Sequence, residues 1–392
     1  MGNHLRLSSK ARYRRERLRR FRALPVSKRV LVLLNRAERR AKRERLFIGP
    51  QTLDVIPTRR CNLRCVGCVH YKTEGPLDLD PEFFKKILEE SASWVIRFRL
   101  CSLGEPFLNP STPEIIRMAG ERGIGCNVMT NGTIMGEDLA DFLVGSTRTD
   151  ILTFSIDGAK AGTCEKLRRG LEFGKLLSNV AAVAEAKRRH KAHRPVIQAN
   201  FVAMRDNAAE LPDLVRLAAE TGIEDIDVNY LTVEGETDIS HSLYQYPDLQ
   251  KQAFREAHGI AEAVGVVLHL PPDVTDGGFR ARCTLPWDSM IIDTDGTARL
   301  CHYSWEEAVG NVRTEGGILA VWNNALYRAV RGTMDSETPA YRYCAHCGIR
   351  RGFSRIHAHM GKNKGNADVF RFDPEGTSAQ PGRSRAQSGS ST

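Results

Sequence analysis

The sequence predicts an α/β protein in which a partial (β/α)6 barrel is followed by a small cysteine-rich module with a β-hairpin. Three observations lead to this fold class. Short β-rich runs alternate with helical stretches, which indicates parallel βαβ units. Gly123 and Gly222 stand just past two of the helical stretches, where a left-handed residue ends a helix. The last third of the chain carries spaced cysteines around an Asp295-Gly296 turn, which favours a hairpin.

Six strands and five intervening helices make up the expected barrel. The strands are Leu53–Ile56, Val95–Leu100, Gly125–Met129, Ile151–Ile156, Val196–Val202 and Ile226–Asn229. The helices are Pro81–Ser91, Pro113–Arg122, Glu137–Val144, Phe173–Lys191 and Glu210–Thr221. Because active sites of such barrels lie at the C-terminal ends of the strands, the motifs that follow these strands are expected at one mouth.

The chain divides into five expected segments. They are a basic helical arm (1–50), the core barrel (51–240), a connecting helical segment (241–282), a cysteine-marked module (283–352) and a tail (353–392). The connecting segment holds a helix near Gln250–Ala263, and the hairpin of the module spans Met290–Leu300. The tail is rich in Ser, Gly, Pro and Arg and is expected to be disordered after about residue 373.

Positive charge is concentrated at the start of the chain. The net charge is +10, but residues 1–46 hold 17 Lys and Arg against three Glu, so the arm carries +14 and the remainder −4. We expect a solvated arm, with contact to an acidic partner, RNA or an anionic membrane surface as the alternative. The sequence contains no apolar run of the roughly 18 residues that a membrane span needs. It also shows no signal peptide, so the expected location is cytoplasmic.

The first cysteine group follows the first expected strand and reads Cys61-Asn62-Leu63-Arg64-Cys65-Val66-Gly67-Cys68. In a reducing compartment, clustered cysteines indicate metal or redox chemistry rather than disulfides. Three thiolates in this spacing can hold three irons of a [4Fe–4S] cube and leave the fourth iron open to a ligand. The alternative is a structural zinc site, for which His70 could supply the fourth ligand.

Both the C-x3-C-x2-C spacing and the Cys-Asn-Leu-Arg-Cys wording resemble the radical S-adenosylmethionine (SAM) superfamily. The resemblance implies that the open iron binds SAM, that one electron cleaves SAM, and that a 5′-deoxyadenosyl radical then abstracts hydrogen from a substrate. It also implies an electron donor of the flavodoxin or ferredoxin type. The family usually has an aromatic residue just before the third cysteine, where this chain has Gly67. His70 and Tyr71 are the candidates for the missing packing near the adenine.

Further motifs that resemble SAM contacts of this family follow the later strands. Gly104, Glu105 and Pro106 follow the second strand and resemble the family's Gly-Gly-Glu-Pro segment, in which the Glu and backbone groups contact the SAM ammonium. Asn131 follows the third strand. Ser155 and Asp157 follow the fourth, where the family places ribose or substrate contacts. Each motif on its own is also typical of an ordinary turn, so the prediction depends on the order of the motifs after successive strands.

Cys164 lies in the loop after the fourth strand. In related enzymes this loop faces the substrate, and a thiol there can donate a hydrogen atom to a substrate radical, as epimerisation requires. The alternative is a small side chain in a tolerant loop.

The second cysteine group consists of Cys283, Cys301, Cys344 and Cys347. Four thiolates suffice to ligate a [4Fe–4S] cluster completely, and a zinc ribbon-like site is the alternative. The stretch resembles the twitch domain, a shorter relative of the SPASM domain, in Cys283-Thr284-Leu285-Pro286-Trp287, Asp295-Gly296, Gly310-Asn311-Val312 and Trp322. Its spacing looks like that of 2-deoxy-scyllo-inosamine dehydrogenase. The resemblance implies an auxiliary cluster that accepts an electron from a substrate radical, or one that orders a cap over the active site.

These features predict a radical SAM oxidoreductase that dehydrogenates or epimerises a small polar substrate, such as a sugar, aminocyclitol or nucleoside. The alternative is a peptide-modifying enzyme of the kind that matures ribosomally made peptides, in which the basic arm would hold an acidic leader. A more distant alternative is a non-catalytic iron–sulfur or RNA-binding protein. Only the basic arm supports that reading, and the arm carries no recognised RNA-binding motif.

Overall fold

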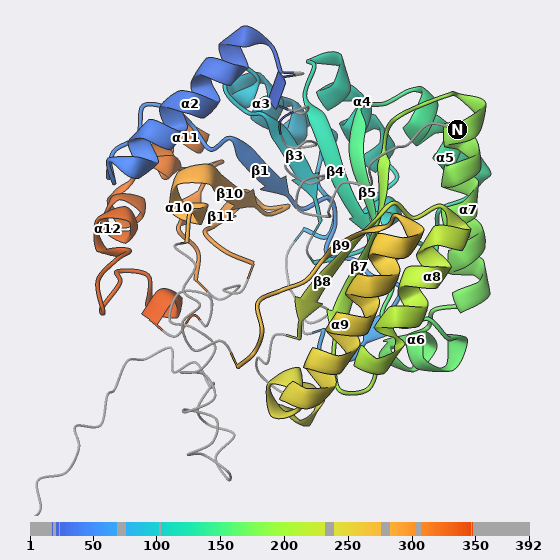
Figure 1. The fold of residues 1–392 in the computed structure, drawn as a ribbon. Coiled ribbons are helices and arrows are strands. Elements are labelled where there is room, and N and C mark those ends of the chain that lie inside the picture. Colours follow the sequence, from blue (N-terminus) through green and yellow to red (C-terminus); the bar gives the residue numbers. More distant parts are fainter. Residues whose placement is uncertain are drawn as a thin grey trace, which may run out of the picture.

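The computed structural model describes residues 18, 21–22, 24–68, 76–101, 103–231, 239–275, 283–302, 307–345 and 347. Within these residues, one sheet of ten strands organises the molecule (Figure 1), in the order β12-β11-β10-β1-β3-β4-β5-β7-β8-β9. The second sheet is a two-stranded ribbon of β2 and β6. The predicted class, a partial barrel followed by a module with a hairpin, is confirmed.

The six expected barrel strands occur in chain order and are parallel to one another. They are β1 (Thr52–Val55), β3 (Arg97–Leu100), β4 (Gly125–Thr130), β5 (Thr149–Ser155), β7 (Val196–Ala203) and β8 (Asp225–Tyr230). A seventh parallel strand, β9 (Val267–His269), pairs with β8 and was not expected from the sequence.

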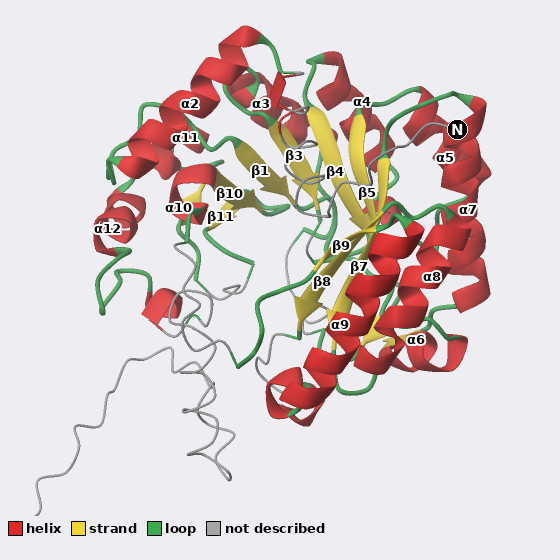
Figure 2. Cartoon of the chain, in the orientation of Figure 1, coloured by secondary structure: helices red, strands yellow, loops and turns green. Residues whose placement is uncertain are grey.

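Helices cover the outer face of the sheet (Figure 2). They are α3 (Pro81–Ser91), α4 (Thr112–Glu121), α5 (Glu137–Gly145), α7 (Phe173–Arg189), α8 (Leu211–Thr221) and α9 (Pro247–Val264). The Asp80 side chain caps α3 by accepting a hydrogen bond from the Glu82 amide at 3.1 Å. Gly222 ends α8 at a φ of +87°, the left-handed conformation that its position predicted.

Side chains alternate between the helices and the interior of the barrel. On β3, Phe98 and Leu100 are fully buried, whereas Arg97 and Arg99, which alternate with them, are half-buried. On β7, Ala199 and Phe201 are likewise buried, and the polar Asn200 between them is half-buried. Since the apolar positions face the covering helices, the polar ones line the interior. The interior of this barrel is therefore polar, unlike a packed barrel core.

The C-terminal module continues the barrel sheet. Its elements are α10 (Leu285–Asp288), β10 (Ser289–Ile292), β11 (Thr297–Arg299), β12 (Gly310–Asn311), α11 (Ile318–Trp322) and α12 (Ala325–Thr333). The β10–β11 hairpin is antiparallel, as expected, but β10 also pairs in parallel with β1, with Thr52 opposite Ser289. The module is thus joined to the first barrel strand by backbone hydrogen bonds.

The N-terminal segment is not a solvated arm where the structure describes it, contrary to expectation. Helix α2 (Val26–Arg40) lies along the rim beside the C-terminal module (Figure 1). Asn35 Nδ2 donates to the Trp287 carbonyl at 2.6 Å, and Trp322 Nε1 donates to the Ile48 carbonyl at 3.0 Å. The charged composition of this segment predicted that solvent would surround it, but its polar side chains bind the module instead. Residues 1–17 and the tail 353–392 lie outside the described residues.

None of the helices described here is both long and apolar enough to cross a membrane.

Candidate active site

The first cysteine group forms a loop at the C-terminal end of β1. Strand β2 (Arg64–Cys65) pairs with β6 (Arg168–Arg169), which places Cys65 opposite Arg168. Gly67 has a φ of +76°, a conformation that strains any residue with a side chain. This geometry explains why glycine occupies the position before the third cysteine, where the family has an aromatic residue.

The three thiols of this loop have the chemistry of a cluster site. Cys61, Cys65 and Cys68 are all partly buried, and burial raises the pKa of the Cys61 and Cys65 thiols. Their mutual negative charge, once ionised, raises the pKa of both further. Thiolates here therefore need a cation, and bound iron supplies one. Among the described residues no three His, Cys, Asp or Glu side chains are grouped as ligands of a single metal ion, so the fit rests on the donor set and its spacing.

Gly104 and Glu105 connect the end of β3 to the cysteine loop. A Cβ at Gly104 would lie 2.4 Å from the Arg60 carbonyl oxygen, so only glycine permits this approach. The Glu105 amide donates to the same oxygen at 2.8 Å. Pro106 begins the short 3-10 turn η2 (Pro106–Leu108), which follows Glu105 directly.

Glu105 is almost fully buried and is held by the end of β4. Its carboxylate accepts hydrogen bonds from Thr130 Oγ1 at 2.7 Å and from the Asn131 amide at 2.6 Å. Burial raises the pKa of the Glu105 carboxyl, and these hydrogen bonds oppose the rise. Asn131 Nδ2 in turn donates to Asn62 Oδ1 at 2.8 Å and lies 3.9 Å from Cys61 Sγ. The structure thus brings the predicted residues after β3 and β4 against the first cysteine group.

The motif of Asp157 predicted a contact with ribose or substrate, but its carboxylate has a different environment. One carboxylate oxygen accepts from the Val202 amide at 2.8 Å, and the other pairs with Arg168 Nη1 at 2.5 Å. Both oxygens are therefore engaged by the protein itself. Ser155 ends β5 and is 7% exposed.

Arg168 is the site residue that sequence reasoning missed. Its side chain is 11% exposed, and burial lowers its pKa, but Asp157 and Cys65 outweigh burial and raise the pKa overall. The guanidinium is close enough to Cys61 and Glu105 to influence their pKa values as well. It is thus a permanent cation among the predicted SAM contacts. The only available signal was a basic residue in the Cys164 loop, which is too common to be informative.

Cys164 lies in α6 (Ala161–Leu167) and is fully buried. Burial raises the pKa of its thiol to about 12, so it stays protonated at neutral pH. The side chain belongs to the main apolar core rather than to an exposed loop.

Two members of the second cysteine group, Cys283 and Cys301, lie next to the open end of the hairpin in the chain. Cys283 precedes α10, and Cys301 follows β11, beside the start of β10. Cys344 lies in η6 (Arg342–Ala345) and is 8% exposed, whereas Cys283, Cys301 and Cys347 are partly buried. Four partly or fully shielded thiols are the donor set of a fully ligated iron–sulfur cluster. His346 is outside the described residues.

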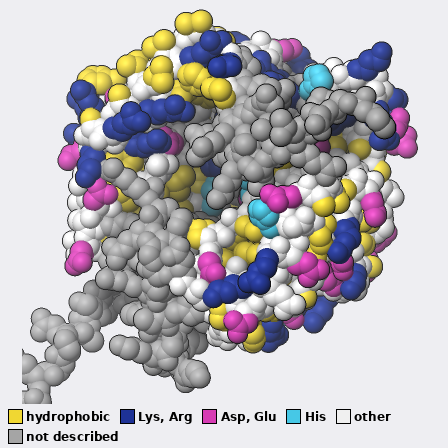
Figure 3. All heavy atoms as spheres, viewed as in Figure 1, with side chains coloured by type: hydrophobic (Ala, Val, Ile, Leu, Met, Phe, Trp, Pro, Cys, Tyr) yellow, Lys and Arg dark blue, Asp and Glu magenta, His cyan; other side chains and the backbone are white. Residues whose placement is uncertain are grey.

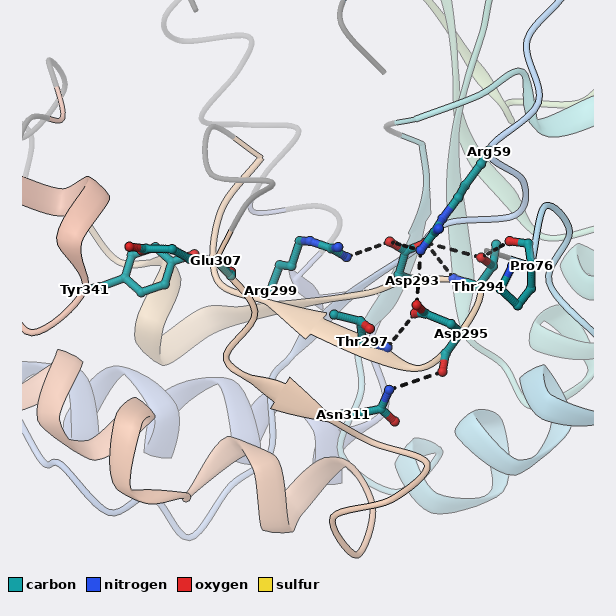
Figure 4. Close-up of polar contacts among 10 residues, drawn as sticks. All are labelled: Arg59, Pro76, Asp293, Thr294, Asp295, Thr297, Arg299, Glu307, Asn311 and Tyr341. Carbon is teal, nitrogen blue, oxygen red and sulfur yellow. Dashed lines mark hydrogen bonds and ion pairs between the residues drawn. The ribbon is translucent and has the colours of Figure 1, made fainter. Parts of the chain in front are cut away.

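A buried ion-pair network joins the tip of the hairpin to the first cysteine loop (Figure 4). Asp293 is fully buried and accepts from Arg59 Nε at 2.9 Å and pairs with Arg59 Nη2 at 2.8 Å. Arg299 Nη1 reaches Asp293 Oδ2, which Arg59 Nη2 also contacts, at 2.6 Å, and Asp295 lies 3.3 Å from Arg59 Nη2. Because Arg59 is two residues before Cys61, the C-terminal module fixes the start of the first cysteine loop.

A second link between module and barrel crosses the interior. Asp54, in the middle of β1, is almost fully buried and pairs with the Arg99 guanidinium from β3. His302 Nε2 lies 2.6 Å from Asp54 Oδ2, one of the two oxygens that Arg99 also contacts. Burial opposes ionisation of Asp54, but Arg99 and His302 hold its pKa below the usual value. The contact of His302 with a barrel strand was not foreseen from the sequence.

The opposite wall of the interior is acidic and amide-rich. Asn229 Nδ2 donates to Asn200 Oδ1 at 2.9 Å, and His269 Nε2 lies 2.9 Å from Asp225. Burial raises the pKa of Asp227 between them. Figure 3 shows a hollow in the middle of the molecule, with histidine and apolar side chains visible within it. The interior is thus equipped to bind a polar substrate.

Comparisons with known proteins agree with this geometry. A family profile described as the Radical SAM superfamily matches residues 55–242, and one described as an iron–sulfur cluster-binding SPASM domain matches residues 283–348. The mycofactocin maturase MftC of Mycobacterium tuberculosis is 26% identical over 318 residues, which cover 78% of this chain and 77% of the relative. The tungsten-containing aldehyde ferredoxin oxidoreductase cofactor-modifying protein of Pyrococcus furiosus is 24% identical, covering 75% and 86% of the two chains.

Among solved structures, SuiB of Streptococcus suis bound to S-adenosylmethionine superposes with a TM-score of 0.62 at 16% identity. The match covers 79% of this chain and 73% of SuiB. At this identity the likeness concerns the fold. The cofactors that these two domains bind are SAM and [4Fe–4S] clusters, an auxiliary one included. The chain carries a radical SAM domain at residues 55–242, followed by a C-terminal SPASM domain at residues 283–348.

Proposed function

We propose that this protein is a peptide-modifying radical SAM/SPASM enzyme. A relative with a peptide substrate in its name supports this over the small polar metabolite expected from the sequence. It is the PqqA peptide cyclase of Xanthomonas, 28% identical over about half of each chain. The relative MftC is named a maturase. SuiB has also been solved with its precursor peptide SuiA, at a TM-score of 0.60. The specific resemblance to 2-deoxy-scyllo-inosamine dehydrogenase stays a prediction from the sequence.

The observation that carries the proposal is that the C-terminal ends of β1, β3 and β4 meet at the first cysteine group. Cys61, Cys65 and Cys68 would hold the SAM-binding cluster, and Cys283, Cys301, Cys344 and Cys347 the auxiliary one. When bound, the first cluster would supply the electron for the reductive cleavage of SAM that starts hydrogen abstraction from the substrate, and the second would take up the electron released on substrate oxidation. An electron donor of the flavodoxin or ferredoxin type would reduce the first cluster.

The remaining roles follow from charge and hydrogen-bonding capacity. SAM carries an ammonium and a carboxylate, which need an acceptor and a cation respectively. Glu105, with Gly104 and Pro106 shaping its turn, supplies the acceptor. Arg168, kept in place by Asp157, supplies the cation. Asp157 therefore acts on SAM by positioning Arg168.

Other predicted residues are assigned by their surroundings. Asn131 orients the cysteine loop through Asn62, and Ser155 stands at the mouth of the barrel near the expected ribose. Cys164, as a buried thiol, fills the space behind Arg168, and hydrogen-atom donation would require the helix that carries it to move. The polar interior, with Arg99 on one wall and Asp227 on the other, would hold the backbone and side chain of the modified residue.

An anaerobic assay tests the proposal. The cluster-loaded enzyme is incubated with SAM and dithionite, and 5′-deoxyadenosine is quantified by mass spectrometry in the presence of a host ultrafiltrate. Half of the ultrafiltrate is first digested with a protease that is then removed. Stimulation of 5′-deoxyadenosine formation that digestion abolishes supports a peptide substrate. Stimulation that survives digestion would restore the small-metabolite alternative, and Cys61→Ala is the control for background cleavage.

A further inference from the structure

Helix α2 is amphipathic in the inverted sense: its polar face is buried and its apolar face is exposed. The buried residues of the helix are Lys28, Asn35 and Glu38. The exposed large residues are Val26 at 70%, Val30 at 47%, Leu33 at 53% and Leu34 at 49%. At about 100° per residue, the exposed four fall within one stripe, and Lys28 and Asn35 lie on the opposite side of the helix.

The buried face is anchored by specific contacts, so the orientation of α2 is fixed. Lys28 Nζ donates to the Val95 carbonyl at 2.7 Å, and Arg39 pairs with Asp288 at 2.6 Å. Glu38 Oε1 accepts from the Phe47 amide at 2.8 Å. Rotating the helix to bury its apolar stripe would break these bonds and leave buried polar groups unpaired. The stripe is therefore held outward by the fold.

Arginines flank this apolar stripe. Arg29, Arg36 and Arg40 lie along one side of it by helical periodicity. Beyond the helix, exposed Arg43 stacks over the ring of Phe47, which is itself 79% exposed. Figure 3 shows apolar side chains next to basic ones on the rim, at the position of α2 in Figure 1. The stripe from Val26 to Ala37 is about 16 Å long.

We propose that this surface, Val26–Phe47, docks on an anionic lipid surface. An interfacial helix presents a stripe of apolar side chains to the acyl boundary, with arginines beside it that contact lipid phosphates. The stripe is the convex face of a helix at the rim, which suits a plane, whereas a peptide helix or strand needs a groove or a sheet edge. A second copy related by two-fold symmetry would bring the arginine rows together, which repel each other. The proposal does not depend on the peptide substrate.

The test uses the cluster-loaded full chain and vesicle sedimentation. Vesicles are made of phosphatidylcholine alone or of phosphatidylcholine with phosphatidylglycerol. The double variant Leu33→Gln/Leu34→Gln is compared with Val264→Gln, which changes a 44% exposed apolar residue on α9, away from the stripe. Formation of 5′-deoxyadenosine shows that both variants are folded, because neither site touches the cysteine groups.

Wild type and Val264→Gln are expected to sediment with the phosphatidylglycerol vesicles only, less so at high salt, whereas the double variant binds about tenfold or more weakly. Two results would overturn the proposal. In the first, the wild-type protein stays in the supernatant with both kinds of vesicle. If it then forms concentration-dependent dimers that the double variant does not form, the stripe binds a second copy of this chain. In the second, the double variant binds like wild type, so that basic charge alone explains the binding.

Discussion

Replacing Asp293 with Asn removes the negative centre of the network that joins the hairpin to the first cysteine loop. The carboxylate is fully buried and receives three charge-assisted contacts between 2.6 and 2.9 Å, two from Arg59 and one from Arg299. After the change, the Arg59 side chain, which is 6% exposed, keeps its 3.3 Å contact with Asp295 but loses its closer carboxylate partner. Breaking a buried pair in this way costs about 3–5 kcal/mol. That is a large part of the roughly 5–15 kcal/mol by which domains are stable.

The assay is anaerobic urea unfolding of the cluster-loaded protein, followed by tryptophan fluorescence and by release of iron to a chelator. Asp213→Asn is the matched control, because Asp213 pairs with Arg216 at 2.7 Å but both side chains are about half exposed. The control is expected to change the free energy of unfolding by about 0–1 kcal/mol. Asp293→Asn should also release iron faster, since Arg59 stands two residues before Cys61. If its unfolding midpoint and its iron release match those of the control, the network does not hold the cysteine loop.

Four further predictions concern single residues. Arg168→Gln should weaken SAM binding about tenfold or more, as the loss of a charge-assisted hydrogen bond of roughly 1.5–3 kcal/mol implies, and unchanged affinity in equilibrium dialysis would remove its role. Cys61→Ala should abolish 5′-deoxyadenosine formation. Cys347→Ala should still form 5′-deoxyadenosine but no modified product. Normal turnover by Cys347→Ala would contradict electron transfer to the auxiliary cluster. Cys164→Ala should lower the unfolding midpoint and leave SAM cleavage intact, and loss of product inversion alone would instead identify a hydrogen-atom donor. Asp54 has a lowered pKa, so its stabilising contribution is present above about pH 4 and is lost as the pH falls through the lower folded-state value. The unfolding midpoint of Asp54→Asn should therefore fall less than that of wild type below pH 4.

The barrel could be predicted because each of its strands and helices has a sequence pattern within its own residues. Each strand is a short β-rich run followed by a helix that ends at a recognisable residue, as at Gly222. The strand β9 was missed because three residues, Val267–His269, give no periodicity to detect. The parallel pairing of β1 with β10 was missed for another reason: the paired residues, such as Thr52 and Ser289, are far apart in sequence and carry no local sign of one another.

The candidate site was partly predictable on similar grounds. Glu105 and Asn131 lie in motifs placed after successive strands, so their approach to the cysteine loop followed from topology. Arg59 and Arg168 belong to no motif, and a single arginine in an arginine-rich chain carries no signal. Composition also misled at α2, where charge suggested solvation. The pattern of that helix is regular, but nothing in the sequence says which face turns inward.

The way the module joins the barrel limits how a substrate can enter. A cap on a flexible linker could open, but here β10 shares backbone hydrogen bonds with β1 along its whole length. The buried pairs of Asp54 with His302 and of Asp293 with Arg59 add side-chain contacts in the middle of β1 and just past the end of β10. Opening the module would break all of these at once, at a cost comparable to unfolding. A peptide substrate of the proposed kind would therefore reach the polar interior through the mouth of the barrel, past the loop of the first cysteine group, while the module stays in place. Both cysteine groups would then keep fixed positions on either side of one strand during the reaction, which sequential oxidation of a bound substrate requires.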